Sequence, residues 1–262
     1  MLKRVITHLK ISLARFFNAL YWTTKIKVFR VLSNRLVRGI LVKVNDVILC
    51  VTNISDLDEQ IRSDYEKPVF DYLIQYLRSV EHQRGTVVFI DVGANIGRYS
   101  IYLAKKFPKL LAIAIEPDPD AYLALIKGVK ANNIDNVIVL NIAAYDTDGF
   151  ITLFRKRAAT ISSIVDKTDV FEVIKVRARS LDSLIKELGI NHIDIVKIDV
   201  EGAEFYVLQG FRDGIVRFKP KVIIEVRKDN KKRILEFFMD VGYKCKSIIE
   251  GKDIEYLLCE CQ

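Results

Sequence analysis

The sequence contains no apolar stretch that approaches the roughly 18 residues needed to cross a membrane as a helix. It also contains no low-complexity tract and no internal repeat, so a repeat architecture is not expected. With 50% hydrophobic and 28% charged residues, the composition is that of an ordinary globular protein. A chain of 262 residues can bury a sizeable core, and we expect one large α/β domain with additions.

The cysteines lack the spacing of a zinc site and the C-x-x-C pattern of a redox centre. They are Cys50, Cys245, Cys259 and Cys261. Because cysteine also behaves as a small hydrophobic residue, we interpret all of them as reduced thiols, as in a cytoplasmic protein. A secretory signal peptide is not expected, since Lys10 and Arg15 interrupt the apolar region that it would need.

Acidic residues are missing from residues 1–45, which carry ten lysines and arginines, whereas the other 217 residues carry 31 basic and 33 acidic ones. The apolar spacing over residues 2–20 predicts an amphipathic helix with basic residues on its opposite side, and Tyr21 and Trp22 follow it. Such a helix either packs on the domain and leaves its lysines in water, or contacts an anionic membrane surface or a lipid substrate. Residues 1–39 could also bind nucleic acid through their positive charge, although nucleic acid is not the expected partner.

From residue 87 onward, apolar strands alternate with helices, a pattern typical of a parallel sheet with helices on both faces. The predicted strands span residues 40–44 and 47–51, which form a hairpin, and then 87–91, 110–115, 137–142, 150–154, 171–177, 193–198, 221–226, 243–249 and 254–259, of which the last two form an antiparallel hairpin. The other predicted helices span residues 65–77, 97–106, 120–131, 180–188, 203–210 and 230–240. No interdomain linker is visible, so we expect one domain over residues 61–262, preceded by a basic helical and hairpin extension over residues 1–60.

The turn between Asp91 and Gly97 lacks two of the three glycines of a dinucleotide-binding fingerprint. Counted from Gly93, Asn95 and Arg98 stand where G-x-G-x-x-G has its second and third glycines. The second glycine makes room for a pyrophosphate, which S-adenosylmethionine does not have. A glycine turn still lets a ligand approach the backbone, and the helix start behind it offers N–H groups to a carboxylate. The pattern therefore favours S-adenosylmethionine over a nicotinamide dinucleotide.

Glu116 ends the next predicted strand, about twenty residues beyond the glycine turn. At that spacing a carboxylate is placed to hold the two hydroxyls of a ribose. In an open α/β sheet the ligand lies outside the carboxyl ends of the strands, where Asp91 also stands and would face the ammonium group of the methionine moiety. We therefore expect S-adenosylmethionine to bind across these two strand ends.

Four segments of the sequence occur in the order found in one enzyme family. They are Asp91-Val-Gly-Ala-Asn-Ile-Gly97, Glu116-Pro117, Ala143 to Gly149, and Lys197-Ile-Asp-Val-Glu-Gly-Ala-Glu204. Together with Tyr65-Glu66 and Ser162-Ser163, they resemble the FkbM-type methyltransferases, a branch of the class I S-adenosylmethionine-dependent enzymes. The resemblance implies the α/β, Rossmann-like fold of that class, a seven-stranded and mostly parallel sheet whose last strand is antiparallel.

The resemblance also implies O-methylation, often of a sugar or glycan hydroxyl or of a secondary metabolite. It implies that the glycine turn lines the methionine end of S-adenosylmethionine, that Glu116 binds the ribose, and that the segment from Asn141 flanks the adenine. Carried over by position, the cofactor-binding residues are Asp91, Gly93, Ala94, Asn95, Gly97, Glu116, Pro117, Asn141, Ala143 and Ala144.

A second group of carboxylates follows the strand at residues 193–198 and ends the strand after it. A hydroxyl is a poor nucleophile until a base removes its proton, and burial or a neighbouring negative charge can make a carboxylate basic enough. We assign substrate or base roles to Asp199 or Glu201, with Glu225 next. A structural alternative is that Asp199 caps the following helix and that Glu204 only interacts with its dipole. No metal site is expected, because no histidine stands among these carboxylates.

The expected activity is O-methylation of a hydroxyl of a sugar or glycan, another small molecule or a glycolipid. The segment 147–180 is rich in basic residues and is expected to form much of the acceptor's wall. The alternatives are an RNA ribose 2′-O-methyltransferase and a non-catalytic methyltransferase-like scaffold tethered to a membrane or partner through residues 1–39. Methylation of a nucleic-acid base is disfavoured, since Asp199-Val-Glu-Gly replaces the Asn/Asp-Pro-Pro-aromatic block and no cysteine lies near it.

Overall fold

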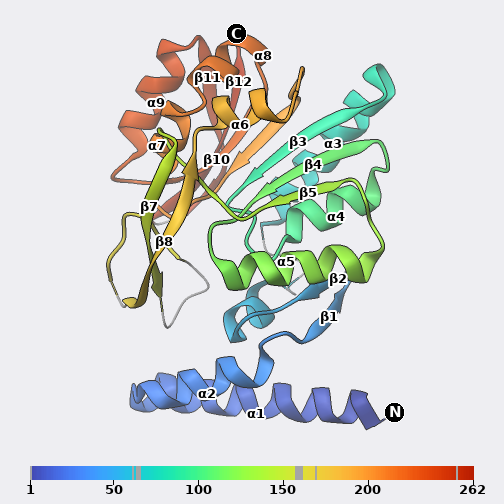
Figure 1. Cartoon of the computed structure of the whole chain (residues 1–262), viewed down its shortest axis with the longest axis vertical. Coiled ribbons are helices and arrows are strands. Elements are labelled where there is room, and N and C mark those ends of the chain that lie inside the picture. The colour runs from blue at the N-terminus through green and yellow to red at the C-terminus, as the bar shows by residue number, and fades with distance from the viewer. Residues whose placement is uncertain (1, 61, 63–65, 157–161, 169, 252) are drawn as a thin grey trace.

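A seven-stranded sheet forms the centre of the computed structural model, which describes residues 2–60, 62, 66–156, 162–168, 170–251 and 253–262 (Figure 1). Its strands are β3 (Val87–Val92), β4 (Leu110–Ile115), β5 (Val137–Leu140), β9 (Ile195–Ile198), β10 (Lys221–Arg227), β11 (Tyr243–Glu250) and β12 (Ile254–Cys261). Tyr65, part of the family motif, and residues 157–161, part of the expected acceptor wall, lie outside the described residues.

The strands follow the order β11-β12-β10-β9-β3-β4-β5 across the sheet. Five neighbouring strands, from β10 to β5, pair in parallel, whereas β12 is antiparallel to both of its neighbours. Every residue of β3 is buried, as expected for a strand covered on both faces. The predicted sheet, mostly parallel with an antiparallel last strand, is confirmed.

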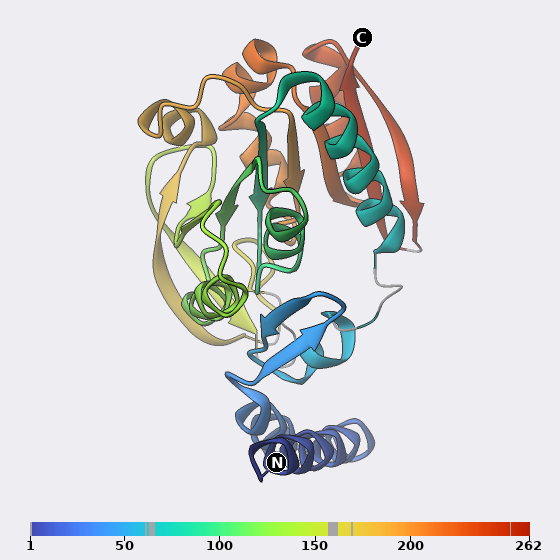
Figure 2. The same cartoon turned by 90° about the vertical axis from the view of Figure 1, so that its right-hand side faces the viewer.

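Helices cover both faces of the sheet (Figure 2). On one face lie α3 (Lys67–Arg84), α4 (Arg98–Lys106) and α5 (Pro119–Asn132), and on the other α6 (Leu181–Glu187), α7 (Glu204–Gln209), α8 (Arg212–Phe218) and α9 (Lys231–Asp240). The sequence does not predict α8, because Gly214 stands in its middle and glycine disfavours a helix. A Cβ at that position would lie 2.6 Å from a ring carbon of Phe211, so close packing requires the glycine.

Two smaller sheets flank the central one. β6 (Ala143–Ala144), β7 (Gly149–Lys156) and β8 (Val170–Arg179) form a three-stranded sheet beside the carboxyl ends of the central strands. β1 (Leu41–Val44) and β2 (Val47–Cys50) form the predicted hairpin, which packs against α5 and is followed by a π-helical turn, η1 (Asp56–Gln60).

The N-terminal helices lie outside this body, at the bottom of Figure 1. α1 (Leu2–Thr24) is the predicted helix with one more turn, and α2 (Lys27–Val37), which the sequence does not predict, runs back along it. Its apolar and basic residues do follow a helical spacing, so the sequence contains a pattern for α2 that the prediction did not use. α2 is fixed to the body by Arg30, which donates a hydrogen bond to Ser55 Oγ (2.6 Å). None of the helices in the described part of the chain is long and apolar enough to cross a membrane.

Cys245 and Cys259 form a disulfide between β11 and β12, so the prediction that all cysteines are reduced is wrong. The two strands form the predicted hairpin, but their register shifts between Ser247 and Ile249. This bulge brings Cys245 opposite Cys259, whereas the register next to the turn would place Glu260 there. Because the hydrophobic pattern does not reveal a bulge, the sequence does not reveal the pairing. The cytoplasmic location inferred from reduced thiols loses that support.

Candidate active site

The carboxyl ends of β3, β4, β9 and β10 border a cavity of about 120 Å³. The predicted cofactor residues that line it are Gly93, Ala94, Asn95, Glu116, Pro117, Ala143 and Ala144. The predicted catalytic residues Asp199, Glu201 and Glu225 line the same cavity. The structure thus brings together two groups of residues that the sequence places far apart.

Both glycines of the turn are required by contacts within the protein. Gly93 has a φ of +79°, and a Cβ there would lie 2.8 Å from the carbonyl carbon of Asp199 and closer still to its oxygen. Gly97 has a φ of +84°, and its Cβ would collide with the side chain of Leu125. Gly97 does not line the cavity within the described residues, so its role lies in packing α4 against α5. The sequence-based explanation, room for a ligand, does not anticipate either contact.

Two other predicted cofactor residues support the cavity wall from behind. Asp91 is buried and accepts a hydrogen bond from Ser100 Oγ (2.6 Å), which ties β3 to the first turn of α4. Burial raises the pKa of Asp91, against the opposing effects of Lys197 and of the Ser100 hydrogen bonds. Asn141 donates from Nδ2 to the carbonyl oxygens of Glu116 (2.9 Å) and Pro117 (3.0 Å). Asn141 therefore fixes the backbone of Glu116, whose carboxylate is expected to bind the ribose.

Glu116 lies in the cavity wall with both carboxylate oxygens held by the backbone. Oε2 accepts from the N–H of Asn95 (2.8 Å), and Oε1 accepts from the N–H of Asp118 (2.8 Å). Burial raises the pKa of Glu116 to about 8, despite these two hydrogen bonds. When Glu116 is ionised, each of its carboxylate oxygens retains a second lone pair. The side chain is therefore oriented in advance and can still accept hydrogen bonds from a diol.

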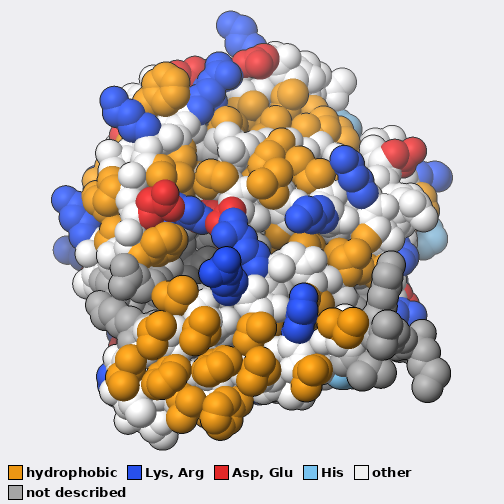
Figure 3. All heavy atoms as spheres, turned by 60° about the horizontal axis from the view of Figure 1, so that its bottom comes forward, with side chains coloured by type: hydrophobic (Ala, Val, Ile, Leu, Met, Phe, Trp, Pro, Cys, Tyr) orange, Lys and Arg blue, Asp and Glu red, His pale blue; other side chains and the backbone are white. Residues whose placement is uncertain are grey.

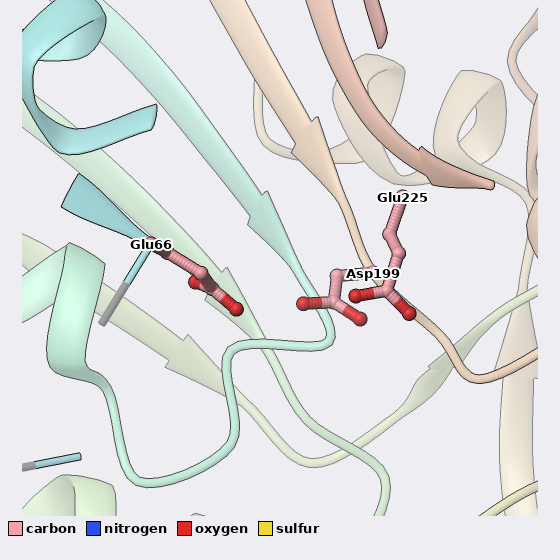
Figure 4. A group of neighbouring side chains, drawn as sticks. All are labelled: Glu66, Asp199 and Glu225. Atoms are coloured by element: carbon pink, nitrogen blue, oxygen red, sulfur yellow. The ribbon is translucent and has the colours of Figure 1, made fainter. Parts of the chain in front are cut away.

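Glu66 joins two of the predicted catalytic carboxylates, Asp199 and Glu225, in one cluster (Figure 4). Their nearest carboxylate oxygens all lie within 4.8 Å of one another. Lys197 Nζ donates to Asp199 Oδ2 at 2.8 Å, and it lies 4.7 Å from the centre of the Tyr99 ring. The cluster thus has an internal cation that holds one of its three acidic groups.

Two tyrosines fix Glu66 in this cluster. Tyr99 donates from its hydroxyl to Glu66 Oε2 (2.5 Å), and the Tyr256 hydroxyl lies 2.7 Å from Glu66 Oε1 and 3.2 Å from Asp199 Oδ2. Glu66 precedes α3 with a left-handed φ of 48°, so the chain turns sharply as it delivers this side chain. The sequence indicates Glu66 only through the family motif, because it lies outside the strand-end pattern.

Burial makes two of the predicted catalytic carboxylates unusually basic. It raises the pKa of Glu225 to about 9, with a further contribution from the negative charges of Asp199 and Glu201. It raises the pKa of Glu201 to about 7, where Asp199 adds to the shift and Arg227 opposes it. Arg227 Nη2 donates to Glu201 Oε2 at 2.8 Å. Glu201 therefore has a pKa near neutrality, which suits a general base.

The capping role considered for Asp199 is wrong. The residue that precedes α7 is Ala203, and no side chain caps this helix. Glu204 lies in its first turn, is buried, and accepts from the N–H of Gly202 at 2.8 Å, without lining the cavity within the described residues. Asp199 is thus available to the cavity, whereas Glu204 stabilises the turn that presents Glu201.

The sheet has the strand order of the class I S-adenosylmethionine-dependent methyltransferases. Glu116 stands at the end of β4, next to the glycine turn that follows β3. Together these features define the chain as a member of that class. The family model described as the methyltransferase FkbM domain matches residues 91–245, more than half of the chain. The chain belongs to this family.

Several characterised or solved proteins are similar to the chain. It is 30% identical over 168 residues to the 31-O-demethyl-FK506 methyltransferase FkbM of Streptomyces tacrolimicus, covering 53% of this chain and 64% of that protein. It is 26% identical over 167 residues to the methyltransferase sdnD of Sordaria araneosa, covering 52% and 64%. A crystal structure of a methyltransferase FkbM from Methylobacillus flagellatus KT is 21% identical, with a TM-score of 0.46, and covers 67% of this chain and 43% of that one. The chain spans less than two thirds of the length of the curated relatives it matches.

Proposed function

We propose that this methyltransferase binds S-adenosylmethionine in the cavity between the glycine turn and Glu201, and transfers its methyl group to a hydroxyl of a sugar or glycan, another small molecule or a glycolipid. The observation that carries this proposal is the position of Glu201, a carboxylate with a pKa of about 7 in the same cavity as Glu116. Glu116 suits the binding of a ribose, and Glu201 suits the removal of a proton from the acceptor hydroxyl.

The residues of the cavity fit the parts of S-adenosylmethionine. Glu116 is oriented to accept hydrogen bonds from the ribose hydroxyls. Buried apolar residues that line the cavity, among them Ile115, Ala144 and Leu153, offer a surface for the adenine. The backbone of the glycine turn lies at the wall where the methionine end would sit. When bound, the cofactor supplies an electrophilic methyl group on a sulfonium.

Glu201 is the residue to which we assign the acceptor's proton. Arg227 holds its Oε2, so Oε1 would accept the proton that the acceptor hydroxyl loses on methylation. Glu225, with a pKa of about 9, carries a proton at neutral pH and donates a hydrogen bond that orients the acceptor. Asp199 is fixed by Lys197 next to Glu225, and we assign it a role in positioning the acceptor.

Oxygen as the methylated atom is supported by two independent points. The name of the Streptomyces relative, 31-O-demethyl-FK506 methyltransferase, indicates transfer to oxygen in that protein. In this chain, Asp199 and Glu201 stand where enzymes that methylate amino groups of bases carry an Asn/Asp-Pro-Pro-aromatic block. Carboxylates at this place suit a hydroxyl, whose proton must be removed.

The test is to incubate extract of the source cells with the protein and methyl-labelled S-adenosylmethionine, and to separate glycan, lipid, RNA and small-molecule fractions. We expect label in a glycan, lipid or small-molecule fraction, stable to mild base as an ether is, and absent with Glu201→Gln. Label mainly in RNA would instead support ribose methylation, and cofactor binding without any labelled product would support a non-catalytic scaffold.

The cofactor site has a test of its own. We expect the double variant Gly93→Val/Glu116→Ala to lose S-adenosylmethionine affinity in isothermal titration calorimetry, because it disturbs the turn and removes the ribose carboxylate. Glu201→Gln serves as the matched control, since it changes a cavity residue that we assign to the acceptor. Retained affinity in the double variant would overturn the cofactor assignment.

A further inference from the structure

The outward side of the α1–α2 hairpin is apolar. Nine of the eighteen exposed large hydrophobic residues in the described part of the chain lie between residues 6 and 32. They are Ile6, Leu9, Leu13, Phe16, Trp22, Ile26, Val28, Val31 and Leu32, which we call the apolar face. Figure 3 shows apolar side chains gathered into one broad field at this end of the molecule. A field of this kind marks an interaction surface on a globular protein.

The opposite side of the hairpin packs on the body of the protein. The apolar face is therefore not the side by which the hairpin is attached to the domain. Ala14 on α1 and Val37 on α2 are fully buried. On α2, Arg30 bonds to Ser55, and Asn34 Oδ1 accepts from the N–H of Ile54 at 3.2 Å. On α1, the exposed apolar residues Ile6, Leu9, Leu13 and Phe16 thus point away from the domain.

Basic residues accompany the apolar face. Lys10, Lys25 and Arg35 are exposed, and Lys25 Nζ lies 4.4 Å from the centre of the Trp22 ring. Figure 3 shows lysines and arginines along the border of the apolar field. Since residues 1–45 carry no acidic residue, a second copy of the hairpin would bring like charges together. An anionic lipid surface complements both the apolar centre and the basic border.

A second cavity, of about 640 Å³, has walls in common with this face and with the active-site cavity. Val28 and Val31 belong to the apolar face and also line this cavity. Arg35 lines it as well and has no hydrogen-bond or ion-pair partner among the described residues. Ser162 lines both this cavity and the one that contains Glu116. The second cavity therefore lies next to the active site as well as next to the apolar face.

We propose that the apolar face docks on an anionic phospholipid bilayer, and that the second cavity takes its methyl acceptor, the hydroxyl of a lipid headgroup or of a lipid-linked sugar, from that surface. The docking half depends only on the α1–α2 hairpin. The acceptor half rests on the proposed O-methyltransferase function.

Docking is tested by sedimentation of the full chain with vesicles of phosphatidylcholine alone or mixed equally with phosphatidylglycerol. We expect binding to the mixed vesicles that weakens with salt. Leu9→Glu/Phe16→Glu should weaken it at least about a hundredfold, because each buried apolar side chain contributes about tenfold or more. Lys10→Gln and Lys25→Gln should each weaken it about fivefold.

The matched control is Val216→Glu/Met239→Glu, which places the same charges on exposed residues of α8 and α9, far from the hairpin. This control should bind vesicles as the wild type does, and circular dichroism should show that both double variants are folded. Absence of wild-type binding to the mixed vesicles, or equal binding of both double variants, overturns the proposal. It is also overturned if the apolar face instead joins two copies of the chain. In that case the wild type would remain a dimer in the presence of vesicles, and Leu9→Glu/Phe16→Glu would make it a monomer.

The acceptor half is tested with labelled cofactor and a membrane fraction. We expect label in material extracted with chloroform and methanol, and much less of it with Leu9→Glu/Phe16→Glu, whose cofactor affinity should be unchanged. Vesicle binding with label only in water-soluble products overturns the acceptor half and leaves the proposed function intact. Vesicle binding without any methylated product would instead contradict the proposed function.

Discussion

Gly93 offers the sharpest test of how the active site is held together. Its φ of +79° costs an alanine about 1–2 kcal/mol, because a Cβ disfavours the left-handed region. In addition, that Cβ would lie 2.8 Å from the carbonyl carbon of Asp199, a backbone group that cannot rotate away. Overpacking of this kind typically costs about 1–3 kcal/mol more. Gly93→Ala should therefore lower the free energy of unfolding by about 2–5 kcal/mol.

The chain contains a matched control in Gly242. Its φ is +78°, nearly that of Gly93, and an added Cβ would meet nothing within 4 Å. Gly242→Ala should therefore lose only the backbone term, about 1–2 kcal/mol. Any effect of alanine on the unfolded chain is shared by both variants. The difference between the two, about 1–3 kcal/mol, measures the close approach of the Asp199 backbone to the turn.

Urea denaturation of the ligand-free proteins gives both free energies of unfolding, and calorimetry gives the affinity for S-adenosylmethionine. Because relief of the overlap must displace Asp199, Gly93→Ala should also lose affinity, whereas Gly242→Ala should keep it. Equal destabilisation by the two substitutions would refute the explanation that Gly93 is needed for this contact.

Three further predictions concern titration and the disulfide. Because the pKa of Glu201 is about 7, kcat/KM should rise with pH to about 7, level off, and fall again above about 9, where Glu225 loses its proton. Glu201→Gln should remove the rising limb and lower kcat about 10²–10⁴-fold in steady-state assays. Burial raises the pKa of Glu116 from 4.5 to about 8, so the folded protein binds more protons than the unfolded one, and stability should fall as pH rises between these values. The slope from Glu116 reaches at most about 1.4 kcal/mol per pH unit, and urea titrations of Glu116→Gln should show it reduced. Cys245→Ala should lower the free energy of unfolding by about 2–3 kcal/mol, as should reduction of the wild type, and thiol labelling in denaturant should detect two thiols before reduction and four after it.

The sequence predicts the parts of the fold that depend on local pattern. Asp91, Glu116, Asp199 and Glu225 could be placed at the carboxyl edge of the sheet because each follows or ends an apolar strand. Parallel strands separated by helices bring such ends to one edge, whatever their order. For the same reason half of the residues that line the active-site cavity are among the site residues that the sequence predicts.

What the sequence does not show depends on contacts between distant segments. Glu66 enters the site through its hydrogen bonds to Tyr99 and Tyr256, and no spacing along the chain indicates these. The disulfide depends on a bulge that shifts Cys245 by one position in its strand pair. The orientation of α1 depends on its packing against α2, and an amphipathic pattern does not say which neighbour a helix packs against. In each case the deciding partner lies on another element.

The carboxylate cluster is costly for the free protein, and this cost fits the proposed chemistry. The Lys197 ammonium faces Asp199, Glu66 and Asp91, and removal of several like charges from water is unfavourable unless each is paired. The protein offsets part of this cost by protonation, since the pKa of Glu225 is about 9. A bound methyl donor would bring a positive sulfonium to this cavity, whereas the product after methyl transfer would carry a neutral thioether. We infer that the negative charge of the cluster would favour the methyl donor over its product.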